Sequence, residues 1–223
     1  MTAARGRFIS LEGGEGTGKS TQARILAAAL ETRGVSVRVT REPGGSPFAE
    51  KVREVLLSGL AQPLGPQGEA ALFAAARADH VRETIAPALE AGTWVICDRF
   101  TDSTRVYQGA VGKADPRLLR ALDRVSVGAR VPDLTLVLDV PPEIGLARAV
   151  ARGKGAAADR FEREGADYHA AIRAAFLALS GAEPERCVVI DARGDVESVA
   201  AQILSAVSAR LALPTAAESP GGG

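Results

Sequence analysis

The sequence has few sulfur-containing residues and few aromatic residues. Of its 223 residues, two are cysteine, one is tryptophan and two are tyrosine. Cys97 and Cys187 both lie inside short apolar runs. We therefore expect two small buried strand residues in a reducing compartment, rather than a disulfide or a pair of metal ligands.

The sequence also lacks net charge and long apolar runs. Lysine plus arginine and aspartate plus glutamate number 27 each, so no overall field favours nucleic acid or an anionic membrane. No apolar stretch approaches membrane-spanning length, and the first residues lack the apolar core of a signal peptide. We expect a cytoplasmic protein that binds neither nucleic acid nor membrane. The length suits a single domain at 1–213, followed by a disordered tail at 214–223.

Short β-branched runs alternate with longer patterns of helical periodicity. The predicted strands are 8–11, 35–40, 94–98, 134–140 and 187–191. The predicted helices are 21–33, 47–58, 67–92 with an interruption near Pro87, one starting at Asp115-Pro116, one through 168–179 and one through 199–207. This alternation predicts an α/β fold of three layers, with a five-stranded parallel sheet between helices. Ligands in such folds collect at the carboxyl ends of the strands.

The most specific motif follows the first predicted strand. Gly13, Gly18, Lys19 and Ser20 satisfy the P-loop pattern G-x-x-x-x-G-K-[ST]. Glycines let successive backbone N–H groups face an anion, and the following helix adds its positive N-terminal end. Lys19 can then reach the β- and γ-phosphates, and the Ser20 hydroxyl can ligate Mg²⁺. The motif predicts nucleotide binding without saying what happens to the phosphate.

An acidic residue ends the third predicted strand and another ends the fourth. Asp98 has the position of the Mg²⁺-side carboxylate of P-loop enzymes, and Asp139 competes for this role. Arg99 favours Asp98, because one loop then supplies both a carboxylate for Mg²⁺ and a guanidinium for phosphate. An aspartate that merely caps the strand is the alternative.

Arginines gather after the fourth predicted strand. Arg148 and Arg152 are four residues apart and share one helix face, and Lys154 and Arg160 follow among glycines and alanines. Transfer between two phosphate esters needs cations and water exclusion at the moment of transfer, which a mobile lid over 141–164 can supply. A solvated helix without a catalytic role is the alternative.

Two further groups suit recognition of a base. Phe73 and Arg77 lie one helical turn apart, so an aromatic ring and a guanidinium share a face. The stretch 104–109 is polar and aromatic and follows the Asp98 loop. Taken alone, each has an ordinary interpretation as a core phenylalanine, a surface arginine or a loop that leads into a helix.

Six ordered motifs together resemble bacterial thymidylate kinases. They are FISLEGGEGTGKST at 8–21, TREPGG at 40–45, CDRF at 97–100, YQG at 107–109, PDLT at 132–135 and DRFE at 159–162. The match runs from about residue 7 to about residue 205, in the order of the family. The resemblance implies transfer of the ATP γ-phosphate to dTMP, giving dTDP for dTTP synthesis, with Mg²⁺ as cofactor and a homodimer as the assembly.

The resemblance also implies roles for individual residues. The ATP site would comprise Gly13, Gly14, Glu15, Gly16, Thr17, Gly18, Lys19, Ser20, Thr21 and Arg193, with Ser20 and Asp98 at Mg²⁺, directly or through water. The dTMP site would comprise Glu15, Glu42, Pro43, Arg53, Phe73, Arg77, Arg99, Thr104, Tyr107 and Gln108. The catalytic set would be Glu15, Lys19, Arg99, Arg148, Arg152 and Arg160.

Within the dTMP site, the resemblance places each group against a part of the nucleotide. Arg53 and Arg99 would hold the phosphate, Phe73 would stack on thymine and Arg77 would reach its O4 atom. Glu15 would face the sugar and phosphate, Glu42-Pro43 would shape the phosphate side, Thr104 and Gln108 would meet the remaining base edge, and Tyr107 would crowd a ribose 2′-hydroxyl.

Two positions decide the subtype. Gly16 stands where some family members carry a P-loop arginine, while the lid is rich in arginine. The chain therefore resembles the lid-arginine type. Phe100 stands where tyrosine or histidine is common after Asp-Arg, which leaves the contact made at this position open.

Three alternative functions were weighed against this interpretation. A kinase for another monophosphate is the closest alternative, and the base pocket discriminates against it. A GTPase-type switch predicts an Asn-Lys-x-Asp motif, which the sequence lacks; we regard the D-x-x-G match at 191–194 as chance. An ATP-binding module without turnover gives no reason for a cationic lid.

Overall fold

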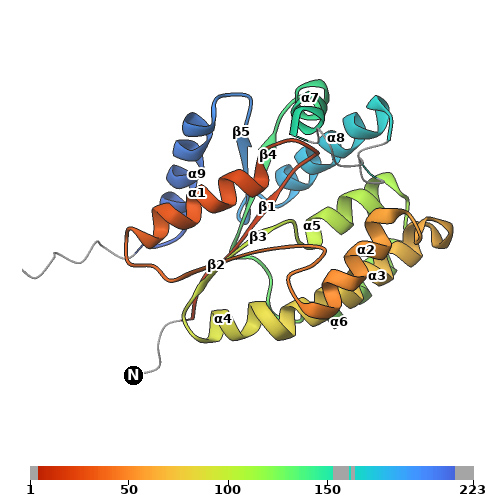
Figure 1. Ribbon diagram of the computed structural model, residues 1–223, viewed down its shortest axis with the longest axis horizontal. Coiled ribbons are helices and arrows are strands. Elements are labelled where there is room, and N and C mark those ends of the chain that lie inside the picture. The colour runs from red at the N-terminus through yellow and green to blue at the C-terminus, as the bar shows by residue number, and fades with distance from the viewer. Residues whose placement is uncertain (1–4, 153–160, 162–163, 214–223) are drawn as a thin grey trace, which may run out of the picture.

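The computed structural model describes residues 5–152, 161 and 164–213. Within these residues five parallel strands form one sheet in the order β2-β3-β1-β4-β5 (Figure 1). The strands are β1 Phe8–Glu12, β2 Val37–Arg41, β3 Trp94–Asp98, β4 Leu134–Asp139 and β5 Cys187–Asp191. The predicted α/β fold with a five-stranded parallel sheet is confirmed.

Helices fill the connections between the strands. They are α1 Lys19–Glu31, α2 Pro47–Ser58, α3 Gly65–His80, α4 Ala86–Glu90, α5 Thr101–Thr104, α6 Pro116–Ser126, α7 Pro142–Arg152, α8 Ala166–Ala182 and α9 Val196–Arg210. Short turns of other helical types are the 3₁₀ turn η1 Gln62–Leu64 and the π-helical turns η2 Val81–Ile85 and η3 Arg105–Val111. None of the helices in the described part of the chain is both long and apolar enough to cross a bilayer.

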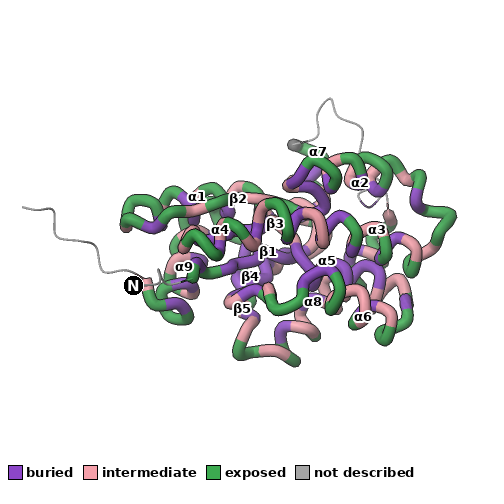
Figure 2. Tube along the Cα trace, turned by 90° about the horizontal axis from the view of Figure 1, so that it is seen from below, coloured by how far each residue is buried: buried purple, intermediate pink, exposed green. Residues whose placement is uncertain are grey.

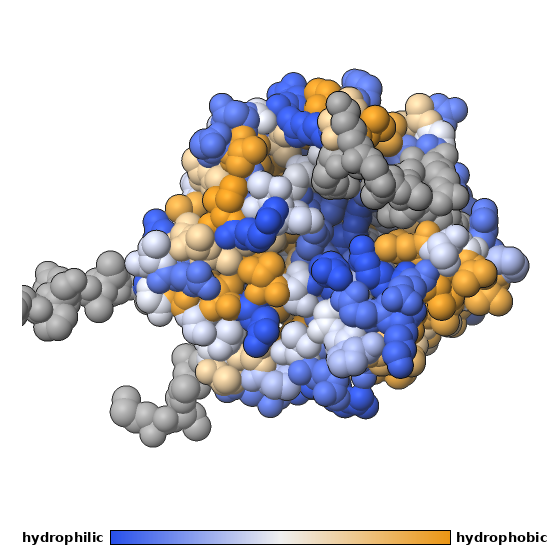
Figure 3. All heavy atoms as spheres, viewed as in Figure 1, coloured by the Kyte–Doolittle hydropathy of each residue, from blue (hydrophilic) through white to orange (hydrophobic). Residues whose placement is uncertain are grey.

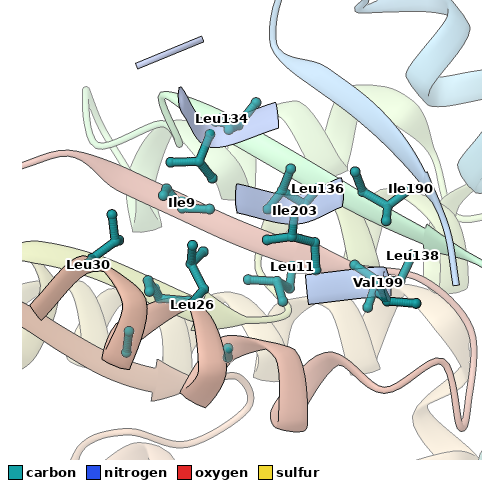
Figure 4. Close-up of a cluster of buried hydrophobic side chains, with 14 of the residues drawn as sticks. Ile9, Leu11, Leu26, Leu30, Leu134, Leu136, Leu138, Ile190, Val199 and Ile203 are labelled. Atoms are coloured by element: carbon teal, nitrogen blue, oxygen red, sulfur yellow. The ribbon is translucent and has the colours of Figure 1, made fainter. Parts of the chain in front are cut away.

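Alternating strand residues separate the core into two layers. Ile9 and Leu11 of β1 face α1 and α9, where they pack with residues such as Leu26 and Ile203 (Figure 4). Phe8 packs on the other face, against η2 and α4. The central strands β1, β3 and β4 therefore lie buried between two helical layers, as the tube in Figure 2 shows, whereas the edge strand β2 has no buried residue. Burial of each large apolar side chain stabilises the fold by roughly 1.5–3 kcal/mol.

The predicted long helix at 67–92 is three elements. α3 ends at His80, the π-helical turn η2 follows, and α4 begins at Ala86. Pro87 has no N–H to donate to the carbonyl of Glu83, so the regular ladder cannot continue through this point. The predicted interruption near Pro87 is confirmed, and it is one turn long.

The helix after Arg99 was not predicted. α5 and η3 run without a break from Thr101 to Val111. Asp102 fixes this helix to the sheet side, because its carboxylate is 1% exposed and accepts hydrogen bonds from Arg186 at 2.7 and 3.1 Å and from Arg105 at 2.9 Å. A sequence pattern cannot reveal this anchor, since Arg186 is 84 residues away.

Both cysteines lie where the sequence indicates. Cys97 in β3 and Cys187 in β5 are buried and free. Burial raises the pKa of the Cys97 thiol well above its usual value. Both therefore act as small apolar strand residues.

Candidate active site

One cavity of about 410 Å³ lies at the carboxyl ends of β1, β2 and β3. Figure 3 shows a hydrophilic hollow on this face of the molecule. Most of the predicted site residues line the cavity: Glu15, Gly16, Thr17, Gly18, Lys19, Ser20, Thr21, Glu42, Pro43, Arg53, Phe73, Arg77, Asp98, Arg99, Thr104, Tyr107 and Gln108. Segments that are far apart in sequence, from Glu15 to Gln108, therefore meet around one space.

The P-loop forms the floor of one end of the cavity. Gly18 is the N-cap of α1, so Lys19 and Ser20 are its first two residues, two positions before the predicted start. The Lys19 Nζ donates to the carbonyls of Gly14 at 2.7 Å and Gly13 at 3.2 Å. Burial, with a smaller contribution from Arg99, lowers the pKa of Lys19 to about 8. The loop thus presents a desolvated cation beside a helix N-terminus, which favours a phosphate.

The P-loop packs directly against the start of α7. Gly16 has φ +65°, and a Cβ built on it would lie 1.9 Å from the Gly145 carbonyl oxygen. A Cβ on Gly145 would in turn lie 2.4 Å from the Glu15 carbonyl oxygen. Neither position has room for a side chain. The absence of an arginine at position 16 therefore follows from the close approach of these two backbones.

Ser20 and Asp98 are in contact across the cavity. The Ser20 hydroxyl donates to Asp98 Oδ2. A hydroxyl and one carboxylate suit Mg²⁺, which takes oxygen ligands and completes its shell with water and substrate phosphates. In the part of the chain that the structure describes, no three His, Cys, Asp or Glu side chains form a metal cluster. Asp139, the competing carboxylate, is held by Arg173 at 2.7 and 2.9 Å.

A carboxylate and a guanidinium meet at the centre of the cavity. Arg99 Nη2 donates to Glu15 Oε1 at 2.6 Å, and the Tyr107 hydroxyl donates to the same oxygen at 3.0 Å. Burial opposes the charge of Glu15, but Arg99 and then Lys19 outweigh it, and the pKa of Glu15 falls to about 2. Glu15 therefore stays ionised, and Tyr107, whose pKa burial raises, stays protonated.

A second glutamate, which the sequence analysis did not select, supports Arg99. Glu12 is fully buried and accepts hydrogen bonds from the Phe100 N–H at 2.7 Å and from the Ser103 hydroxyl at 2.6 Å. The Ser103 hydroxyl also accepts from Arg99 Nη1 at 3.1 Å. Arg99 itself has φ +71°, an uncommon conformation for a residue with a side chain. Glu12 thus fixes the strained turn that aims Arg99 into the cavity.

Burial and the neighbouring Asp102 raise the pKa of Glu12 to about 7, against hydrogen bonds that lower it. The sequence could have indicated Glu12 as a site residue, since Glu12 ends an apolar strand just as Asp98 does.

Arg77 is buried among polar partners at the end of the cavity away from Lys19. The side chain is 2% exposed, and its Nε donates to Glu42 at 2.7 Å while Nη2 donates to Thr104 at 3.1 Å. Glu42 also contacts His80 Nδ1 at 3.1 Å, and His80 Nε2 contacts Thr40 at 2.7 Å. Arg77 Nη1 is buried without a hydrogen-bond partner in the described residues, with Asp123 3.9 Å away. His80 was not predicted, although it lies one helical turn after Arg77.

An aromatic group forms the wall beside Arg77. The Phe73 and Phe161 rings lie 6.4 Å apart, and the Tyr107 and Phe161 rings meet edge to face at 5.6 Å. Gln108 is 2% exposed, and its Nε2 donates to Glu69 at 3.2 Å. A flat base-sized space therefore has an aromatic side and polar edges.

Arg53 also lines the cavity, and its Nη1 donates to the Pro43 carbonyl at 2.8 Å.

The contacts of Phe100, which the sequence left open, are apolar and aromatic. Phe100 is 1% exposed, packs edge-on against Phe8 at 4.9 Å and lies under Arg77 at 5.3 Å. An apolar ring at this position supports a charged group of the cavity.

Two of the remaining predicted arginines, Arg148 and Arg193, do not line the cavity. Arg148 Nη1 donates to the Ala192 carbonyl at 2.8 Å and Nη2 donates to the Arg193 carbonyl at 3.0 Å. Arg193 is exposed and paired with Asp191 at 2.7 Å. Both lie at the loop after β5, outside the residues that line the cavity. Arg160 lies outside the described residues, and Arg152 is described only as the last residue of α7.

Comparison with known proteins agrees with this geometry. The thymidylate kinase family model matches residues 11–203. Thymidylate kinase of Nitrobacter winogradskyi is 55% identical over 206 residues, covering 92% of this chain and 90% of that protein. Thymidylate kinase of Bradyrhizobium sp. BTAi1 is 54% identical over 215 residues, covering 96% of this chain and 95% of that protein.

The structural comparison points the same way. The crystal structure of thymidylate kinase from Ehrlichia chaffeensis superimposes with a TM-score of 0.72 at 32% identity, covering 92% of this chain and 99% of that one. Family model, relatives and structure all span nearly the whole chain. The chain belongs to the thymidylate kinase family.

Proposed function

We propose that the protein transfers the γ-phosphate of ATP to dTMP, giving dTDP, with Mg²⁺ as cofactor. The observation that carries the proposal is one cavity in which a P-loop lysine and a base-sized pocket lie on either side of the Glu15–Arg99 pair. A donor phosphate and an acceptor phosphate can then meet at Arg99.

The acceptor end suits a pyrimidine with a carbonyl at position 4. Arg77 lines the cavity and has only donors, so its guanidinium suits a carbonyl oxygen of the base. Phe73 supplies the stacking surface. Tyr107, whose hydroxyl donates to Glu15, would crowd a ribose 2′-hydroxyl.

The chemistry needs positioning and charge more than covalent catalysis. Lys19 binds the β- and γ-phosphates, and its pKa of about 8 leaves it mainly protonated at pH 7. Arg99 binds the dTMP phosphate and keeps the attacking oxygen in line with the γ-phosphate. Ser20 and Asp98 would hold Mg²⁺, which would neutralise phosphate charge when bound. Glu15 orients Arg99 and accepts from the sugar hydroxyl.

The lid supplies the positive charge that the transferring phosphoryl group needs beyond Lys19 and Arg99. Arg148 is bonded to backbone carbonyls at the loop after β5, so Arg152 and Arg160 are the stronger candidates for contact with the transferring phosphoryl group. Arg152→Ala should lower kcat by ~10²-fold, because this charge is needed mainly in the transition state. Arg148→Ala, on the same helix, should change kcat by less. If Arg152→Ala raises only the KM for ATP, Arg152 is a binding residue instead.

We also propose a cytoplasmic homodimer. Apolar side chains of α2 and α6 are exposed, Phe48 by 51% and Val125 by 86%, and both helices pack on α3. Large apolar side chains exposed on two helices that flank a third suit a subunit interface. Sedimentation analysis tests this: Phe48→Glu and Val125→Glu should shift a dimer to monomers, and a wild-type monomer at all concentrations would contradict it.

A coupled assay of ADP release tests the reaction. With ATP and Mg²⁺, dTMP should give the highest kcat/KM among dTMP, dUMP, GMP, AMP and CMP. A preference for a purine monophosphate would overturn the base assignment. No turnover with any of the five would overturn the proposed reaction.

A further inference from the structure

One buried carboxylate beside the base pocket has no part in the reaction described above. Glu69 is 3% exposed and lies on α3, four residues before Phe73 and eight before Arg77. These three residues therefore lie along one face of the helix. Gln108, on η3, is 2% exposed and lines the cavity, and its Nε2 donates to Glu69 Oε2 at 3.2 Å.

This contact fixes which way the amide of Gln108 faces. A glutamine amide has a donor arm and an acceptor arm of nearly the same shape, so packing alone does not distinguish them. A carboxylate accepts hydrogen bonds and does not donate them, so the arm that faces Glu69 must be the NH₂ group. The amide oxygen is then the group that Gln108 can offer to a base in the cavity.

The resulting pocket has a defined polarity. Arg77 lines the cavity and offers only donors, and Gln108 offers an acceptor. An imide edge, with a carbonyl at position 4 and an N–H at position 3, matches a donor beside an acceptor. Cytosine has the opposite polarity at both positions, with an amino group at position 4 and an unprotonated ring nitrogen at position 3.

We propose that Glu69 is a specificity-determining positioning residue, which holds the Gln108 amide so that the pocket accepts an imide edge and rejects cytosine. The inference rests on the proposed function, and it concerns how the dTMP end of that same site discriminates. Glu69 does not touch the base; it acts through Gln108.

Glu69→Gln is the direct test, because it keeps the shape of the side chain and lets the Gln108 amide turn over. The readout is the ratio of kcat/KM for dTMP to kcat/KM for dCMP. The variant should lower this ratio by ~10-fold, the effect expected when one buried hydrogen bond no longer discriminates. The loss should appear mainly as a higher KM for dTMP, with kcat little changed.

Two further variants separate this role from a merely structural one. Glu69→Asp keeps an acceptor-only group and should retain most of the wild-type ratio. In a Gln108→Leu background, Glu69→Gln should leave the ratio unchanged, because the amide it orients is gone. Glu197→Gln makes the same chemical change at an exposed position of α9 and should leave the ratio at its wild-type value. Thermal melts establish that each variant folds.

The outcomes distinguish this inference from the proposed function. If the wild-type protein does not prefer dTMP to dCMP, the proposed function is wrong. If the wild type prefers dTMP and Glu69→Gln lowers kcat/KM for both nucleotides by the same factor, the role of Glu69 is overturned. Should Glu69→Gln fail to fold, equal ratios in Glu69→Asp, Gln108→Leu and the wild type would overturn it as well.

Discussion

The two ends of the cavity are built differently. At the acceptor end, Arg77 and Arg99 are largely buried, and each is bonded to a glutamate at 2.6–2.7 Å. At the donor end, Lys19 bonds carbonyls of its own loop. Beside this end but outside the cavity lining, Arg148 and Arg193 contact the loop after β5 or its exposed aspartate. The acceptor end therefore holds its cations in fixed positions, and the donor end holds its cations by exchangeable contacts.

This difference has a physical consequence for the order of events. A buried guanidinium paired with a carboxylate has already lost its water and its freedom, so it binds a ligand without further reorganisation. A lysine that bonds its own loop and an arginine that bonds the backbone carbonyls of another loop must exchange partners first. We expect recognition of dTMP to be rigid and the assembly of the phosphoryl-transfer site to require movement of the donor end.

Arg99→Ala is the variant with the largest expected effect on this comparison. The change removes the proposed ligand of the dTMP phosphate and leaves Glu15 ionised and largely buried without Arg99. Loss of such a charge pair should lower kcat/KM for dTMP by ~10³-fold or more. Steady-state kinetics with each substrate varied should show a far smaller change in the KM for ATP.

Arg82→Ala is the matched control, because Arg82 is 73% exposed and pairs with Asp79 and Glu83 away from the cavity. Equal losses for dTMP and ATP in Arg99→Ala would contradict a fixed acceptor end that is separate from the donor end.

A second test concerns the contact between the P-loop and α7. Gly16→Ala places a Cβ 1.9 Å from the Gly145 carbonyl oxygen in a backbone conformation of φ +65°. The backbone has to shift, at a cost of about 3 kcal/mol in unfolding free energy. Gly14→Ala is the control in the same loop, because a Cβ there meets nothing within 4 Å. If chemical denaturation gives the two variants the same stability, the close approach of these backbones is not what excludes a side chain.

The sequence predicts the fold and most of the site for a definite reason. Apolar runs set the strands, and polar residues such as Lys19, Asp98 and Arg99 stand where the strands end, so parallel pairing brings them together. Helical spacing likewise predicts that Phe73 and Arg77 share a face. A local sequence pattern is enough to predict these residues, because the parallel sheet brings the ends of its strands to one edge.

The supporting residues could not be predicted as readily, because their partners are distant in sequence. Glu12 bonds a serine 91 residues away, and Glu69 bonds a glutamine 39 residues away. The side-chain direction of Arg148 is a similar case, since its acceptors lie 44 or more residues further along the chain. Such contacts depend on which helix faces meet, and a single sequence does not encode that in any local pattern.

The smallest expected effect is a change in the pH dependence of stability. The folded-state pKa of Glu12 is raised from 4.5 to about 7, with burial as the main cause, so the folded protein binds a proton that the unfolded chain has released. Stability from this group is present below pH 4.5 and is lost as pH rises through 7. The loss is about 2 kcal/mol between about pH 5 and pH 7. Glu12→Gln cannot titrate and should flatten this slope, as urea denaturation at several pH values can measure.

Glu15 gives the opposite slope in a separate window. Its pKa is lowered to about 2, so its stabilisation is present above pH 4.5 and is lost as pH falls toward 2. Glu12→Gln should leave that acid limb unchanged, as should the exposed control Glu197→Gln. If Glu12→Gln keeps the wild-type slope between about pH 5 and pH 7, another group titrates there. Glu12, which supports the Arg99 turn, is then already ionised at neutral pH. Its negative charge would help to fix Arg99 at every pH where the enzyme works.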